Sequence, residues 1–424
     1  MKKRIAKIVL CVMVLVIALS SIGLLVGCGT KKKAIIILPG IMGSGFVEET
    51  ADGVKALWDP FGGKIPNISM DDIPKLIKDP AISEILNGLE TEESFFIRMG
   101  CNEEGVPNRD NVRNSNFFTD DILQYGALSY YKDMYESLNA KYGKKYDVFV
   151  FNFDWRLSNV VAAQGLETLI NQRGYESVVL LAHSMGGVVG SCYAALSEAN
   201  AGKIDMMITY GTPFYGAPMG FCVEADPFSY LGVDTMPAVV QTIATKYEAQ
   251  LRNLVANFTG IYELFPYPEL FDMKEYEKNS APFTIDGSLL NDYNEYLLTM
   301  ENLPFNLKAD GSKKTFIKTM LETQKLVFKD VNGVKTHISK TINTKYLVGT
   351  GVDTGATYEI NNNKATQKTV ADGDGTVLYY SASCGLPLDD KNVITVPGVS
   401  HGPLCNDFSN TTKDITFKLL DELK

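Results

Sequence analysis

The chain has little of what metal and disulfide chemistry requires. It contains three histidines and seven cysteines among 424 residues. Beyond Cys28 the cysteines are far apart and none shows metal-ligand spacing, so the sequence predicts no zinc site, no need for another metal and no cofactor. Their odd number leaves at least one thiol free, whatever disulfides form. These five cysteines are Cys101, Cys192, Cys222, Cys384 and Cys405.

Positive charge is also scarce. Lys and Arg number 40 against 50 Asp and Glu, which gives a formal net charge of −10. The first seven residues hold four positive charges and no negative one, so the chain without them carries −14. Nucleic-acid phosphates need a basic face, and so we expect no nucleic-acid partner. The oligomeric state stays open.

The N-terminus has the composition of an export signal. A basic segment at residues 1–7 precedes an apolar run at 8–27, and Leu25-Val26-Gly27-Cys28 follows the pattern of a bacterial lipoprotein signal. We expect residues 1–27 to be removed, Cys28 to carry the lipid and 28–33 to form a short tether. The chain would then be extracytoplasmic, held to the cell membrane by its lipid. An uncleaved membrane helix is the alternative, because the apolar run is long enough to span a bilayer.

The remaining sequence predicts an α/β fold with a mostly parallel, doubly wound sheet. Hydrophobic content of 45% and charged content of 21% are typical of a globular protein with a core. The all-apolar run at residues 34–38 is expected to be a strand covered on both faces. Helices and strands then alternate, as parallel sheets require. Further strands are expected at 147–153, 178–181, 204–210, 346–349 and 393–396, with helices at 130–142, 160–172 and from about 404.

Two stretches interrupt this alternation. The segment at about 46–120 is rich in Gly, Pro and Asp and lacks strong periodicity, so we interpret it as a lid over the site. The segment at about 213–345 contains helical patches and is interpreted as an inserted cap. Its aromatic residues Phe265, Tyr267 and Phe271 favour a cap core, with an acyl pocket as the alternative. Residues 34–424 are therefore expected to form one domain with a lid and a cap.

Ser184 stands at the centre of the strongest motif. Four apolar residues lead into Ala182-His183-Ser184-Met185-Gly186-Gly187, and a new apolar segment follows. This is the strand–turn–helix pattern of a nucleophile elbow, with Ala182 in place of the first glycine. The serine must hold a strained backbone so that its Oγ stands clear of the sheet. A buried strand with an ordinary glycine turn is the alternative, but the pattern favours a serine hydrolase.

A serine nucleophile needs a histidine base. His183 adjoins Ser184 and its side chain is expected to point away from it. His337 lies in a polar patch of the cap and is expected to face solvent. His401 follows the last predicted strand, and only His401 fits the order serine, acid, histidine that this fold requires.

The acid is expected in the segment Asp372-Gly373-Asp374-Gly375-Thr376-Val377. The spacing Asp-x-x-Val favours Asp374, with Asp372 as the weaker candidate. A calcium loop is the rival interpretation of two aspartates with glycines. It fails because Thr376, Val377 and Ser383 stand where an EF-hand needs Asp or Asn, Gly and Glu.

These motifs together resemble the lecithin:cholesterol acyltransferase (LCAT) family of α/β hydrolases, which includes lysosomal phospholipase A2. Their order and spacing match over residues 34–424. The matching pieces are Leu38-Pro39-Gly40-Ile41-Met42-Gly43-Ser44, Asp154-Trp155-Arg156-Leu157, Ala182-His183-Ser184-Met185-Gly186-Gly187, Gly211-Thr212-Pro213, the Asp372–Val377 segment and Ser400-His401.

The resemblance implies a role for each matching position. Ser184 would be the nucleophile, Asp374 the acid and His401 the base. The backbone N–H groups of Ile41 and Met185 would be the oxyanion donors.

Other features of the family transfer less completely. Asp154 and Arg156 would hold the loop after their strand. Cys384 stands where animal members have a disulfide cysteine, but residues 223–383 hold no partner for it, so that disulfide is not carried over.

We therefore expect a membrane-anchored serine acyl hydrolase or O-acyltransferase acting on membrane lipid esters through an acyl-enzyme. A non-catalytic lipid-binding lipoprotein and an exported amidase or peptidase are the alternatives. Because the tether is short, we further expect the domain to tilt toward the bilayer, with apolar residues near Trp58 or at 265–271 touching its surface.

Overall fold

The computed structural model describes residues 33–51, 53–58, 95–114, 127–227, 245, 247–276, 280–406 and 411–423. The predicted signal, Cys28 and nearly all of the tether lie outside these residues. No helix within the described ranges is both long and apolar enough to cross a bilayer.

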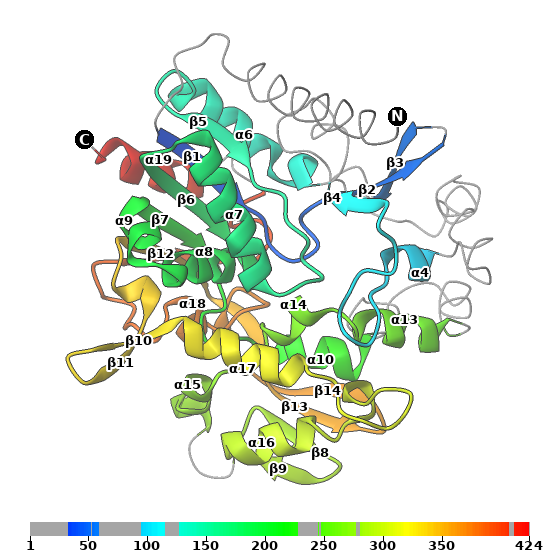
Figure 1. The fold of residues 1–424 in the computed structure, drawn as a ribbon. Helices are drawn as coiled ribbons and strands as arrows, with labels where there is room; N and C mark the ends of the chain where they lie inside the picture. The colour runs from blue at the N-terminus through cyan, green and yellow to red at the C-terminus, as the bar shows by residue number, and fades with distance from the viewer. Residues whose placement is uncertain are drawn as a thin grey trace, which may run out of the picture.

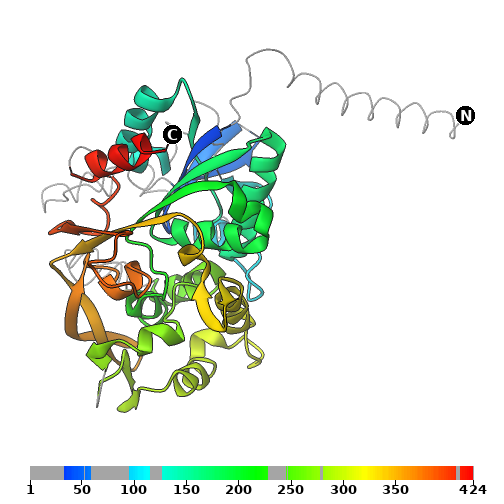
Figure 2. The same ribbon diagram turned by 90° about the vertical axis from the view of Figure 1, so that its left-hand side faces the viewer.

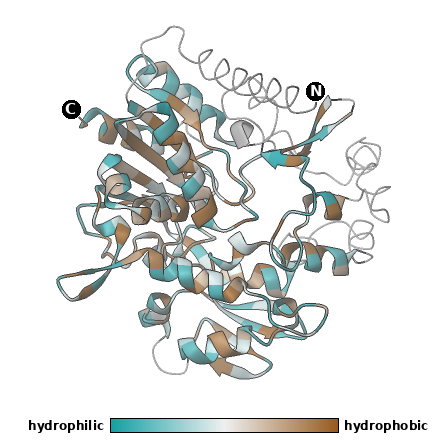
Figure 3. Cartoon of the chain, viewed as in Figure 1, coloured by the Kyte–Doolittle hydropathy of each residue, from teal (hydrophilic) through white to brown (hydrophobic). Residues whose placement is uncertain are grey.

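A six-stranded sheet forms the centre of the molecule (Figure 1), and its apolar strands stand out in Figure 3. Every neighbouring pair in it is parallel. In the order of the sheet the strands are β15 (Val393–Pro397), β12 (Thr344–Thr350), β7 (Ile204–Tyr210), β6 (Ser177–His183), β1 (Lys33–Leu38) and β5 (Asp147–Val150). The predicted doubly wound parallel sheet is confirmed.

Helices cover both faces of this sheet because the strands are apolar on both sides. On one face lie α7 (Asn159–Arg173) and α8 (Met185–Leu196), packed on side chains such as Ile36 and Leu180. On the other face lie α6 (Ala127–Tyr142) and α19 (Thr411–Asp421), packed on Ile37 and Leu181. Successive residues of one strand thus enter two different cores, as strand alternation requires.

The chain between β7 and β12 builds a second body beside the carboxyl ends of the strands, seen below the sheet in Figures 1 and 2. The segment that follows β12 adds a long hairpin to this body, made of β13 (Val352–Asn361) and β14 (Lys364–Gly373). The sequence did not predict this hairpin. This hairpin joins the cap sheet in the order β14-β13-β8-β9. The other elements are α10 (Pro218–Ala225), α13 (Glu248–Val255), α14 (Thr259–Tyr262), α15 (Pro268–Phe271), β8 (Phe283–Ile285), β9 (Ser288–Leu290), α16 (Tyr293–Met300), α17 (Phe316–Leu326), β10 (Phe328–Val331) and β11 (Val334–His337).

The aromatic residues of the cap lie inside it. Phe265 is fully buried and Tyr267 is 1% exposed. Phe265 packs against Phe221 and Tyr262, at ring-centroid distances of 5.6 and 4.9 Å. Phe265 and Tyr267 are cap core, and the expectation that they touch a membrane is wrong, because their packing inside the cap removes them from the surface. Phe271 is half-buried, so for it the expectation stays a prediction.

The described part of the predicted lid is a small sheet, β3-β2-β4, with a short helix. Its strands are β2 (Phe46–Thr50), β3 (Gly53–Trp58) and β4 (Val112–Asn114), and the helix is α4 (Phe95–Met99). Trp58 is half-buried, stacks on Phe95 at 6.2 Å and donates through Nε1 to the Met42 carbonyl oxygen at 3.0 Å. The lid sheet is thereby attached to the turn that follows β1.

Candidate active site

Ser184 occupies the turn between β6 and α8. Its φ of 51° and ψ of −123° place it in a strained conformation that non-glycine residues rarely adopt. The neighbouring glycines are there because of close packing. A Cβ on Gly186 would overlap the Leu38 carbonyl oxygen, and one on Gly187 would overlap the Thr212 side chain. The local backbone is therefore that of a nucleophile elbow.

Asp374 and His401 meet directly at the end of the sheet. His401 Nδ1 lies 2.7 Å from Asp374 Oδ2, and the His401 backbone N–H donates to the Asp374 carbonyl oxygen at 2.8 Å. The other carboxylate oxygen, Oδ1, accepts from the amides of Thr376 and Val377 at 3.0 and 2.7 Å. Asp374 is 1% exposed, so these donors replace the water that a buried carboxylate loses.

Gly211 explains a motif for which the sequence suggested no role. Its φ is 59°, and a Cβ at this position would lie 2.5 Å from Asp374 Oδ2 and 2.9 Å from His401 Nδ1. The Asp374 and His401 side chains pack directly on this glycine, which follows the last residue of β7. Any larger residue there would push the pair apart.

Asp372, the weaker candidate for the acid, points elsewhere. Its Oδ1 accepts from the Gly351 backbone N–H at 2.6 Å, which fixes the base of the β13–β14 hairpin. Asp372 makes no hydrogen bond to His401 among the residues described, and so the geometry favours Asp374.

The nucleophile and base candidates are not hydrogen-bonded to each other. Within the described residues no hydrogen bond joins Ser184 Oγ to His401. The ring of His183, the residue before Ser184, lies 4.8 Å from the ring of His401, between centroids. Catalytic hydrogen bonds are often loose before substrate arrives. Ser184 is 6% exposed and the His401 side chain 16%, so the site is largely shielded from water.

The two predicted oxyanion donors lie on either side of the elbow. Met185 is the first residue of α8, where a helix leaves its backbone N–H groups without partners. Ile41 lies in the turn closed by the Gly43 N–H and the Gly40 carbonyl oxygen at 3.1 Å. A Cβ on Gly40 would lie 3.1 Å from Ser184 Cβ, so this turn passes beside the nucleophile. Neither the Ile41 nor the Met185 amide has a hydrogen-bond acceptor among the described residues.

His337 is not where the sequence put it. It is 2% exposed, and its Nδ1 is hydrogen-bonded to Ser339 Oγ at 2.8 Å. The rings of Phe214 and Phe328 pack on it at 5.1 and 5.2 Å. Burial lowers its pKa to about 3, so it is a neutral core residue. The expectation of a solvent-facing histidine is wrong because the ring of Phe328, its cross-strand neighbour in the β10–β11 hairpin, and the ring of Phe214 from a distant segment enclose it.

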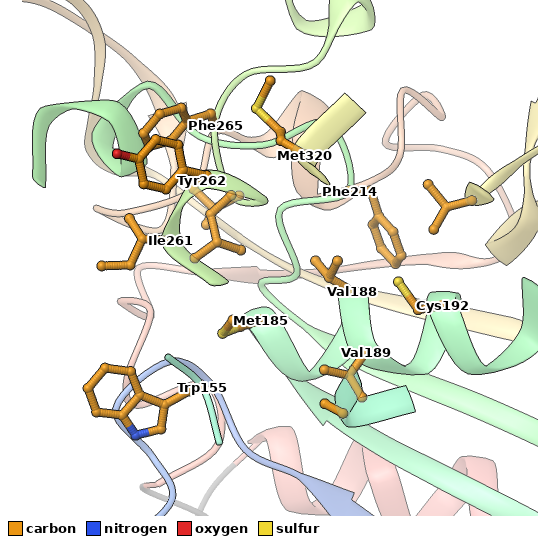
Figure 4. Packing of buried hydrophobic residues seen from close by; sticks show 14 of the residues in the cluster. Trp155, Met185, Val188, Val189, Cys192, Phe214, Ile261, Tyr262, Phe265 and Met320 are labelled. Atoms are coloured by element: carbon orange, nitrogen blue, oxygen red, sulfur yellow. The ribbon is translucent and has the colours of Figure 1, made fainter. Parts of the chain in front are cut away.

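Asp154 and Arg156 hold the loop after β5. The fully buried Arg156 guanidinium donates through Nε and Nη2 to the two Asp154 carboxylate oxygens, at 2.9 and 2.6 Å. Through Nη1 it donates to the Met99 carbonyl oxygen at 2.8 Å. Figure 4 shows Trp155 beside Met185 and Ile261, where this loop supports the elbow and the cap. The structure thus joins the lid, the elbow and the cap at one place.

Two further observations concern the cysteines and the potential metal ligands in the part of the chain that is described. All five cysteines after Cys28 are buried and free, so none forms a disulfide. No group of three or more potential metal ligands is found in the described ranges.

Known proteins resemble this chain over part of its length. The PGAP1-like alpha/beta domain family matches residues 119–261, which contain the elbow. The chain is 26% identical over 291 residues to phospholipase A(1) LCAT3 of Arabidopsis thaliana, covering 60% of this chain and 62% of that protein. It is 25% identical over 326 residues to lecithin-cholesterol acyltransferase-like 4 of the same plant, covering 68% and 58%. These matches support an LCAT-like α/β-hydrolase family for the chain.

The likeness has a limited extent. This LCAT-like chain spans about three fifths of the length of the curated relatives it matches. Among solved structures, a chain of the Tle4–Tli4 complex aligns with 88% of this chain and 96% of that one, at 16% identity and a TM-score of 0.47.

Proposed function

We propose that this LCAT-like protein is a serine-dependent acyl-ester hydrolase or O-acyltransferase that acts on lipids. The observation that carries the proposal is the 2.7 Å contact between Asp374 and His401, packed on Gly211 at the end of the strand beside the elbow of Ser184. A buried carboxylate holding one histidine nitrogen leaves the other nitrogen to act as a base. Water-shielded surroundings strengthen that arrangement.

The proposed reaction proceeds in two halves. His401 Nε2 accepts the proton of Ser184 Oγ as the oxygen attacks the ester carbonyl, while Asp374 stays ionised and holds Nδ1–H. The amides of Ile41 and Met185 donate to the tetrahedral oxyanion. The C–O bond to the leaving alcohol breaks and that alcohol takes the proton from His401. Water or a second alcohol then attacks the acyl-enzyme, His401 accepts its proton, and Ser184 recovers a proton as the acyl group leaves.

A lipid substrate is supported by the names of the two plant relatives, one a phospholipase A(1) and the other an acyltransferase-like protein. The buried cap–elbow contact is also apolar: Met185 is fully buried, Ile261 is 4% exposed, and a Cβ on Gly260 of the cap would lie 2.7 Å from Met185 Cε (Figure 4). An apolar wall beside the nucleophile suits an acyl chain better than a polar peptide.

The place of action is part of the same proposal. Lipidation at Cys28 would anchor the chain outside the cytoplasm, with only five residues before the first predicted strand. Five extended residues reach roughly 17 Å, which keeps the domain at the membrane that holds its substrate. Labelling with a radioactive fatty acid tests this, with Cys28→Ala as the control; label that persists in the variant would contradict the anchor.

The decisive experiment on function combines a fluorophosphonate probe with lipid analysis. The full-length protein should be labelled, Ser184→Ala should not, and mixed phospholipids should yield free fatty acid or, with added alcohol, a new ester. The ratio of the two products separates hydrolysis from acyl transfer. Absence of labelling would favour a lipid-binding protein on this fold, and faster turnover of amides than of matched esters would favour an amidase.

A further inference from the structure

Tyr131 and His183 form a buried connection between the two halves of the site. Tyr131 belongs to α6, on the face of the sheet opposite α8, and it is 1% exposed. Its hydroxyl lies 2.8 Å from the Gly40 backbone nitrogen and 2.8 Å from His183 Nδ1. His183 Nε2 lies 3.2 Å from the carbonyl oxygen of His401. Three hydrogen bonds thus join the turn after β1 to the histidine loop.

The chemistry of the groups fixes the direction of these bonds. A carbonyl oxygen only accepts hydrogen bonds, so His183 Nε2 carries a hydrogen and donates a hydrogen bond to the backbone carbonyl oxygen of His401. Burial, with His401 nearby, lowers the pKa of His183 well below its usual range, so the ring is neutral and Nδ1 is an acceptor. The Tyr131 hydroxyl must then donate to Nδ1 and accept from the Gly40 N–H. Tyr131 and His183 therefore each donate one hydrogen bond and accept one.

The connection is also tightly packed. A Cβ on Gly40 would lie 3.0 Å from His183 Nδ1, and one on Gly43 would lie 3.2 Å from the Tyr131 hydroxyl. The hydroxyl therefore lies within the turn that carries Ile41. The His183 ring is enclosed by Tyr130, Tyr131 and His401, with ring-centroid distances of 6.3, 5.9 and 4.8 Å. Neither loop can move without breaking one of these contacts.

We propose that Tyr131 and His183 are positioning residues, which hold the Ile41 turn and the His401 loop at a fixed separation around Ser184. This inference rests on the proposed function. Tyr131 acts on the oxyanion side through Gly40, whereas His183 acts on the base through the His401 backbone. Neither side chain touches the reacting atoms.

The two sides of this connection, Tyr131 with the Ile41 turn and His183 with the His401 loop, should affect kcat differently when the leaving group of the ester is changed. Nitrophenolate leaves without needing a proton, whereas an alkoxide must receive one from His401. Loosening the His401 loop should therefore harm turnover of an alkyl ester more than that of a p-nitrophenyl ester. Loosening the Ile41 turn weakens oxyanion stabilisation, which both esters need equally. A merely structural role would not produce this difference.

The test measures kcat and KM on a p-nitrophenyl ester and an alkyl ester of the same acid, with full-length protein. Tyr131→Phe should lower kcat on both by about tenfold or more and leave KM within about twofold, because it leaves the Gly40 N–H without its acceptor. Tyr130→Phe is the matched control. It removes a neighbouring hydroxyl that makes no hydrogen bond to any described residue, and it should change kcat by less than about twofold.

Two variants of His183 test whether this residue holds the His401 loop. His183→Met fills the space without a donor and should lower kcat on the alkyl ester by about tenfold or more, with a smaller loss on the p-nitrophenyl ester. His183→Gln restores an N–H near the Nε2 position and should recover a large part of that loss. If His183→Met loses its cooperative unfolding transition, the comparison of Tyr131→Phe with Tyr130→Phe remains the test.

Two results would overturn the inference: folded Tyr131→Phe with kcat within twofold of the wild type, or equal losses in Tyr131→Phe and Tyr130→Phe. Failure of the proposed function looks different, because the wild type itself would then show no Ser184-dependent turnover of either ester.

Discussion

A carboxylate at the carboxyl ends of the central strands and one in the cap are buried in opposite ways. Asp374, at the strand ends (called the sheet edge below), is 1% exposed and has hydrogen-bond partners on both oxygens. Glu224, on α10 of the cap, is 2% exposed, and neither of its oxygens has a hydrogen-bond partner. Burial is nearly the same, and so the difference lies in the donors. The sheet edge is built to keep a charge, whereas this position of the cap is not.

A third carboxylate shows that the cap can also stabilise one. Glu263 follows α14, is fully buried and accepts four hydrogen bonds, from Ser158 Oγ at 2.5 Å, the Asn159 amide at 2.7 Å, Asn159 Nδ2 at 2.8 Å and Thr323 Oγ1 at 2.9 Å. Ser158 caps the N-terminus of α7, so Glu263 joins the cap to the sheet domain. Glu263 therefore holds the cap and the sheet domain together through its hydrogen bonds. Of these three buried carboxylates, Glu224 alone lacks hydrogen-bond partners.

The charge states follow from this difference. Burial raises the pKa of Glu224 to about 8, although the nearby Lys314 ammonium opposes the shift. Burial also raises the pKa of Glu263, but its four hydrogen bonds act against that effect. Glu224 is thus largely protonated at neutral pH, and the cap becomes sensitive to alkali there.

The largest effect is expected from Asp374→Asn, which removes the charge at the sheet edge. An asparagine cannot hold the required tautomer of His401 or stabilise it once it is protonated, so kcat on an ester should fall at least about a thousandfold. The effects of Asp374→Asn and Ser184→Ala should not add, because the residues act as a unit. Near-normal turnover in folded Asp374→Asn would remove Asp374 from the role of acid.

Glu224→Gln tests the uncompensated side of the comparison. The pKa of Glu224 in the folded protein, about 8, lies above the ordinary value of 4.5. The wild type therefore has its full stability below pH 4.5 and loses part of it as the pH rises from 4.5 through 8. The variant should match the wild type at pH 5 and exceed it at pH 9 by on the order of 3 kcal/mol. Urea unfolding at both pH values measures this. Identical pH dependence of the two proteins would show that Glu224 is solvated.

The same substitution at Glu263 should have the opposite sign. In Glu263→Gln the amide NH₂ must face at least one of the four donors, and the lost charge weakens the remaining bonds. We expect the free energy of unfolding to fall by about 2 kcal/mol at pH 7. Glu224→Gln is the matched control in this measurement. A stabilised Glu263→Gln protein would mean that the donors do not compensate its burial.

The smallest effect is expected from Asp372→Asn, two residues before the acid. It weakens one hydrogen bond to Gly351 and leaves His401 untouched, so kcat should change by less than about threefold. Steady-state turnover of the same ester used for Asp374→Asn makes the comparison direct. If Asp372→Asn were the more damaging variant, the assignment of the acid would be reversed.

The sheet was accessible from the sequence because its strands are covered on both faces. Residues 34–38 are apolar throughout and residues 204–210 largely so, a pattern typical of strands buried in a parallel sheet. The segment around Ser184 was equally clear from its own residues, although the close contacts that require its glycines come from Leu38 and Thr212 in other segments. Patterns of this kind lie within one short stretch of the chain.

What the sequence did not predict depends on contacts between distant segments. The β13–β14 hairpin carries many exposed polar residues on β14 and has no apolar alternation there. His337 stands among polar neighbours, and only the packing of Phe214 and Phe328 shows that it is buried. Tyr131 lies 52 residues from His183, so nothing in the local sequence marks it.

The β13–β14 hairpin has a consequence for engineering. One of its strands pairs with β8 inside the cap sheet, and the other ends at Gly373, immediately before Asp374, the proposed acid. A chimaera that replaced residues 213–345 alone would remove the partner of β13 and leave the arm that delivers Asp374 without support. The cap is therefore not an exchangeable module in this protein. A grafted cap must supply a strand that pairs with β13 in place of β8.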